Sequence, residues 1–60
     1  MDKLMVQIDG NFEYVFCRNP SKGIITTKDP KKALPGRALE YFQRYFGNHV
    51  FKVVKVGGRK

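Results

Sequence analysis

Residues 4–17 read Leu-Met-Val-Gln-Ile-Asp-Gly-Asn-Phe-Glu-Tyr-Val-Phe-Cys, and this stretch decides the fold. Apolar side chains alternate with their neighbours on both sides of Asp9-Gly10-Asn11, a tripeptide with strong turn chemistry. Alternation of this kind is typical of strands with one buried face, here over residues 4–8 and 12–17. The stretch therefore predicts a β-hairpin.

The length of the turn sets the register of that hairpin, and two lengths fit the sequence. A two-residue Asp9-Gly10 turn pairs Ile8 with Asn11 and brings Glu13 onto the face of the first strand's apolar residues. A three-residue turn pairs Ile8 with Phe12 instead. It unites the large apolar side chains of Leu4, Val6, Ile8, Phe12, Tyr14 and Phe16 on one face. We expect the three-residue turn, because a slip of one residue would separate this apolar set.

Two more strands are indicated further along the chain. Ile24-Ile25-Thr26-Thr27 is a short β-branched run, which favours a third strand. Residues 49–56 form a fourth candidate with apolar side chains on both faces. A strand that is apolar on both faces is expected in the centre of a sheet rather than at its edge.

One helix is predicted between these strands. Asp29-Pro30 is a helix start signal, but proline at position 35 interrupts a helix, so residues 30–34 are expected to form a single turn and the main helix to begin at Pro35. One apolar stripe follows, formed by Ala38, Leu39, Phe42, Tyr45 and Phe46, and Gly47-Asn48 ends the helix.

These elements predict an α+β fold: a small, mostly antiparallel sheet of three to four strands with one helix packed on one face, in the order β-β-β-α-β. We assign residues 1–56 to this single domain and residues 57–60 to a flexible basic tail. One helix covers one face of a sheet. The other face, with Met5, Val15 and Cys17, is therefore expected to bind a partner protein or a second copy of the chain as a homodimer.

The charge of the chain is strongly positive. Twelve Lys and Arg residues oppose five Asp and Glu residues, for a formal net charge of +7, and all the basic residues except Lys3 lie after residue 17. Such asymmetry indicates an electrostatic footprint for an anionic partner. A net charge of this size also serves solubility in small domains, which is the alternative explanation.

Three groups of basic residues are candidates for anion contacts. Arg37, Tyr41 and Arg44 follow the spacing i, i+4, i+7, so two guanidinium groups flank a phenol that can stack; the alternative is a solvated helix face with Arg44 paired to Glu40. The second group, at the expected helix entrance, is Lys28, Lys31 and Lys32. The alternative explanation for this group is an ordinary exposed loop. The third, along the last strand and tail, is Lys52, Lys55, Arg59 and Lys60, where lysines also protect sheet edges.

Catalysis, metal binding and membrane insertion are not expected. Cys17 and His49 are the single cysteine and histidine, with no third residue to orient them, and the carboxylates are scattered at turns and caps. We therefore expect no enzyme activity, no metal and no cofactor. The longest apolar run falls far short of the ~20 residues of a membrane helix. One unpaired thiol favours a reducing cytoplasm, that of the host if the chain is viral.

The order of elements and the size resemble two groups of proteins. One comprises the small DNA-binding arms of phage and transposon integrases, which lay a three-stranded sheet on DNA. The other comprises tiny phage-encoded inhibitors that attach to a host enzyme such as RNA polymerase. Both resemblances rest on topology and size, so they transfer no residue roles.

Two functional hypotheses follow. The first is a non-catalytic module that binds DNA or RNA, mainly through phosphate contacts. The alternative is a small regulator or inhibitor that binds a host protein, such as a nucleic-acid enzyme, through the uncovered sheet face and is steered by charge to an acidic surface.

Overall fold

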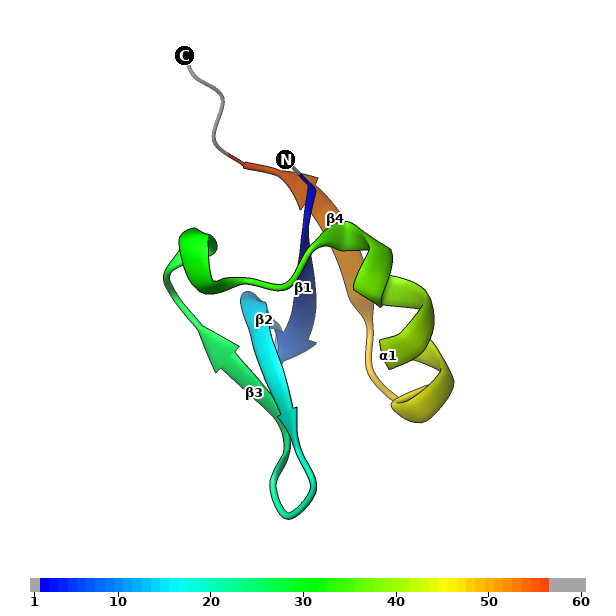
Figure 1. Ribbon diagram of the computed structural model, residues 1–60. Coiled ribbons are helices and arrows are strands. Elements are labelled where there is room, and N and C mark those ends of the chain that lie inside the picture. The colour runs from blue at the N-terminus through cyan, green and yellow to red at the C-terminus, as the bar shows by residue number, and fades with distance from the viewer. Residues whose placement is uncertain (1, 57–60) are drawn as a thin grey trace.

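The computed structural model describes residues 2–56 and confirms the α+β fold with the order β-β-β-α-β (Figure 1). The strands form one antiparallel sheet in the order β3-β2-β1-β4. Its elements are β1 (Asp2–Ile8), β2 (Asn11–Asn19), β3 (Gly23–Thr27), the short 3-10 turns η1 (Pro30–Lys32) and η2 (Gly36–Ala38), the helix α1 (Leu39–Tyr45) and β4 (Phe51–Lys55). The expected tail over residues 57–60 lies outside the described residues.

The turn between β1 and β2 has two residues, so the expected three-residue register is wrong. Ile8 pairs with Asn11, and both Asp9 and Gly10 have positive φ, at 50° and 87°. Two successive left-handed residues give a turn whose twist matches that of the flanking strands. Local turn geometry therefore overrides the register that would have gathered the most apolar side chains on one face.

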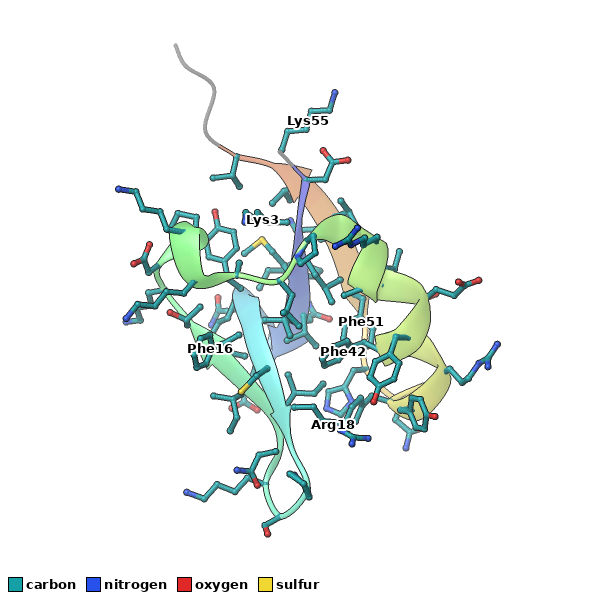
Figure 2. All side chains as sticks on the ribbon, in the orientation of Figure 1. Lys3, Phe16, Arg18, Phe42, Phe51 and Lys55 are labelled. Carbon is teal, nitrogen blue, oxygen red and sulfur yellow. The ribbon has the colours of Figure 1, made fainter. Side chains whose placement is uncertain are left out.

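This register decides which side chains are buried under α1. Leu4, Val6 and Val15 are fully buried there, and Phe42 of α1 packs on them. Figure 2 shows Phe42 beside Phe51 between helix and sheet. Val15, expected on the uncovered face, is therefore a core residue.

The aromatic residues of β2 are not in this core. Phe12 pairs with Gln7 and Tyr14 with Met5, so both lie on the face opposite Val6 and Val15. The expectation that these two rings would fill the core is wrong, because the register moves them by one residue to the other side of the sheet.

A β-bulge at Phe16 changes the faces of β2 again. Val15 pairs with Thr26 and Cys17 with Ile25, so Phe16 is the extra residue. It is 42% exposed, and Figure 2 shows it beside β3, away from α1. Beyond the bulge the alternation is inverted, and Arg18 therefore comes to the side of α1.

The chain reaches α1 by passing between the ends of β1 and β2. Leu34 accepts a hydrogen bond from the Leu4 amide (3.0 Å) and donates one to the Val15 carbonyl (2.8 Å), and Pro35 bridges to Lys3. Leu34 thus takes the place that a direct pair between these strands would occupy. In Figure 1 this segment runs from the turn after β3 across to α1.

The main helix begins later than expected. The single turn expected over residues 30–34 is present as the shorter η1, which ends at Lys32 and whose Lys31 amide donates to the Asp29 carboxylate at 2.9 Å. After Pro35 the chain first forms η2, and α1 begins only at Leu39. Most of the predicted stripe packs on the core, but Tyr45, the last residue of the helix, is 58% exposed.

β4 lies at an edge of the sheet, not in its centre. It pairs with β1 alone, and Val53 stays 37% exposed. Gly36 of η2 approaches it closely, since a Cβ on Gly36 would lie 2.7 Å from the nearest Val53 methyl carbon. The apolar residues that predicted a central strand are thus partly covered by η2 and α1 instead of by a neighbouring strand.

Candidate nucleic-acid interface

The sheet face opposite α1, here called the open face, carries a row of side chains that crosses all four strands. Met5 of β1 pairs with Tyr14 of β2 on one side and with Lys52 of β4 on the other. Tyr14 in turn pairs with Thr27 of β3. Directly paired residues share a face, so Lys52, Met5, Tyr14 and Thr27 form one line across the sheet.

Phe12 lies next to this row and brings a second aromatic ring to the open face. Lys52 extends over it, with its ammonium nitrogen 4.1 Å from the ring centroid, which is a cation–π contact. Tyr14 has no such cation over its ring, and its hydroxyl forms no hydrogen bond within residues 2–56. Both rings are half-buried.

A shallow hollow of about 370 Å³ lies along the two rings. Its lining residues are Met5, Asn11, Phe12, Glu13, Tyr14, Thr27 and Lys28. Of these, Glu13 has its carboxylate turned to Thr26, whose hydroxyl donates to it at 2.8 Å. The hollow thus presents flat apolar rings with an ammonium group at its rim.

The open face is positively charged. Its strand positions on β1 and β4 include Lys3 and Lys52, and Lys28 follows the end of β3. Lys3 donates to the Ala33 carbonyl at 3.3 Å, which holds its ammonium group near the sheet. Among the strand residues that face this side in the described chain there is no Asp or Glu, and the one carboxylate that lines the hollow, that of Glu13, comes from a residue of the other face.

The predicted interface residues Met5, Val15 and Cys17 do not share one face. Met5 and the half-buried Cys17 lie on the open face, Cys17 because the bulge at Phe16 inverts the alternation. Val15 is fully buried on the other side. It therefore cannot contact a partner of the folded protein.

The predicted helix group is brought together, with two additions. Arg37, Tyr41 and Arg44 line one shallow hollow on the outer side of α1, which Tyr45 also lines. Arg18 lies over the rings of both tyrosines, with its guanidinium carbon 5.8 Å from the Tyr41 centroid and 5.7 Å from that of Tyr45. The alternative, an ion pair of Arg44 with Glu40, is not formed in the described structure.

The remaining predicted basic residues are dispersed. Lys31 and Lys32 lie exposed on η1, which six residues separate from α1, so they do not stand at the entrance of the main helix as expected. Lys55 lies opposite Asp2 in the ladder between β1 and β4, near the end of β4. Arg59 and Lys60 lie outside the described residues.

The sequence prediction missed the aromatic part of the open face and the role of Arg18. Asp9-Gly10 is the signal that would have located Phe12 and Tyr14, because a two-residue turn places them beside Met5. No local signal announces the bulge at Phe16, and with it the position of Arg18 beside α1.

Comparisons with known proteins add no family to this description. No family model, curated protein or solved structure matches the chain. Within residues 2–56 no helix is long and apolar enough to cross a membrane, and no three His, Cys, Asp or Glu side chains gather to hold a metal ion.

Proposed function

We propose that this protein is a non-catalytic module that binds single-stranded nucleic acid on its open face. The observation that carries the proposal is the pair of rings, Phe12 and Tyr14, on the side of the sheet without the helix, beside lysines that form no ion pair within residues 2–56. Stacking of bases on aromatic side chains, combined with cations along the backbone, is how proteins bind single strands with little sequence preference.

The composition of the open face favours an anionic partner over a second copy of the chain. A two-fold symmetric dimer places the same patch on both subunits against itself. The lysines of both subunits (Lys3, Lys28 and Lys52 of each) would then share one interface, and like charges brought together without counterions cost free energy. A polyanion removes this repulsion and adds the release of its own counterions.

The rings favour single strands over duplexes. In a duplex the flat faces of the bases are already stacked on one another, whereas an unpaired base has a free face for Tyr14. Lys52 lies over Phe12 in the free protein, and its flexible stem allows the ammonium group to move from the ring to a phosphate when a base arrives.

The proposal is tested by fluorescence anisotropy with labelled oligo(dT) and oligo(U) over a range of salt concentrations. Tyr14→Leu should weaken binding roughly 5- to 150-fold, because one stacked base contributes ~1–3 kcal/mol. The matched control is Tyr45→Leu, which removes an exposed tyrosine on the other side of the molecule and should leave the affinity unchanged.

A charge substitution tests the phosphate contacts separately. Lys28→Gln should reduce the slope of log affinity against log salt by about 0.7, the value for one phosphate of a single strand. Lys22→Gln, in the exposed turn between β2 and β3, is its control and should leave the slope unchanged. Absence of binding by the unmodified protein at low salt, or equal losses in Tyr14→Leu and Tyr45→Leu, would refute the proposal.

A further inference from the structure

A second surface of the molecule, which the proposed function does not use, is built from arginine and tyrosine. It lies on the α1 side of the sheet and is here called the Arg-Tyr surface. Its members are Arg18, Arg37, Tyr41, Arg44 and Tyr45. Figure 2 shows Arg18 reaching from β2 toward α1.

Packing holds the centre of this surface in place. The rings of Tyr41 and Tyr45 lie 4.7 Å apart, and Arg18 covers both. The loop that follows Arg18 is fixed as well, because the Asn19 side chain accepts hydrogen bonds from the amides of Ser21 and Lys22 at 2.8 and 3.0 Å. A surface that is ordered before binding loses little conformational entropy when a partner arrives.

The polar groups of this surface lack partners of their own. Within residues 2–56 the guanidinium groups of Arg18, Arg37 and Arg44 form no hydrogen bond and no ion pair. Tyr41 and Tyr45 are 44% and 58% exposed. Tyrosine and arginine, together with tryptophan, are enriched at the energetic centres of protein interfaces.

Two hollows flank Tyr45, and they differ in chemistry. The first, of about 250 Å³, has Arg37 and Arg44 on its walls. The second, of about 360 Å³, lies between Arg18 and the apolar side chains of Pro20 and Phe46. The arrangement suits a ligand that offers anionic groups on one side of Tyr45 and an apolar group on the other.

We infer that the Arg-Tyr surface binds an acidic segment of a partner protein, with carboxylates on Arg37 and Arg44 and an apolar side chain in the hollow beside Phe46. Carboxylates match the planar fork of arginine and form charge-assisted, bidentate hydrogen bonds with it. A segment that carries both acidic and apolar residues can offer a carboxylate to one hollow and an apolar side chain to the other.

Nucleic acid fits this surface less well than a protein does. Arg18 already lies over the rings of both tyrosines, so less of each ring is free for a base to stack on. Glu40 lines the first hollow between the arginines and repels a backbone that is negative at every phosphate. A protein can place a neutral or basic residue against Glu40, which a nucleic-acid backbone cannot do.

The test uses labelled peptides of alternating Glu and Phe, with Gln–Phe and Glu–Ser peptides as controls for charge and for the apolar group. The unmodified protein should bind the Glu–Phe peptide at least 10-fold more tightly than either control. The double variant Arg37→Gln/Arg44→Gln should lose at least 10-fold in affinity for it. Lys28→Gln, a charge change on the open face, should have no such effect.

Three results would overturn the inference: no preference for the Glu–Phe peptide, equal losses in Lys28→Gln and the double arginine variant, or a loss of oligo(dT) affinity in the arginine variant. The last result would assign the surface to the nucleic-acid footprint. Because Tyr14→Leu should change oligonucleotide binding alone, failure of the proposed function and failure of this inference give different patterns. Circular dichroism confirms that each variant is folded.

Discussion

The two faces of the sheet differ in how deeply their side chains are buried. The face under α1 buries Leu4, Val6 and Val15 completely, whereas the open face leaves Met5 and Tyr14 half-buried beside lysines. A shift of one residue between the two strands would exchange the environments of Val15 and Tyr14 in β2. One face therefore stabilises the domain and the other is available for binding, and a two-residue turn decides which is which.

The strongest test of this comparison places a charge on each face. Val15→Asp should unfold the domain, since an unpaired carboxylate in the core costs several kcal/mol, and a domain of this size has little stability to lose. Gln7→Asp adds the same carboxylate to the open face and should leave the fold intact. Circular dichroism with thermal unfolding measures both. A folded Val15→Asp protein would contradict the assignment of the faces.

The next largest effect concerns η2, the segment that packs against β4. Gly36→Ala should destabilise the protein by ~1–3 kcal/mol, because the new methyl group would overlap Val53 and force η2 away from β4. Gly47→Ala is the matched control, because a Cβ there would lie an ordinary 3.5 Å from the Gln43 carbonyl oxygen. Urea unfolding should separate the two variants. Equal stability would mean that η2 does not press on β4.

A smaller effect is expected at the turn that sets the register. Gly10→Ala should cost ~1 kcal/mol, because φ is +87° there although no atom crowds the site. Gly10→Asn should cost less, since asparagine tolerates left-handed backbone. If both substitutions were neutral in urea unfolding, the turn would not have the two-residue form.

The smallest effect distinguishes the contribution of the Tyr14 ring to binding from that of its hydroxyl. Tyr14→Phe should bind oligo(dT) as tightly as the unmodified protein, because the hydroxyl has no partner among the described residues and stacking needs only the ring. Anisotropy titrations of Tyr14→Phe beside Tyr14→Leu measure this. A large loss in Tyr14→Phe would show that the hydroxyl, not the ring, contacts the ligand.

Local signals predicted the elements of this fold well. The alternation around Val6, the β-branched run from Ile24, the Asp29 cap and the apolar spacing from Ala38 to Phe46 each depend on neighbours in sequence, and the structure contains each element. The helix group of Arg37, Tyr41 and Arg44 follows from the same kind of spacing.

The features that were missed depend on a choice between two turn lengths or on contacts between residues far apart in sequence. Phe12 was expected in the core because the three-residue turn unites the most apolar side chains on one face. The preference of Asp9-Gly10 for a two-residue turn outweighs that gain. The insertion of Leu34 between Leu4 and Val15 joins segments far apart in sequence, and no pattern near Phe16 marks its bulge. The candidate site on the open face depends on these features, which is why its aromatic residues escaped prediction.

The central claim is that the open face, rather than the side of α1, contacts single-stranded nucleic acid. Chemical-shift mapping of backbone amides by NMR during titration with oligo(dT) tests it most directly. The account predicts that the largest shifts occur at Met5, Phe12, Tyr14, Thr27 and Lys52. Shifts confined to Arg18, Arg37 and Arg44 would contradict it.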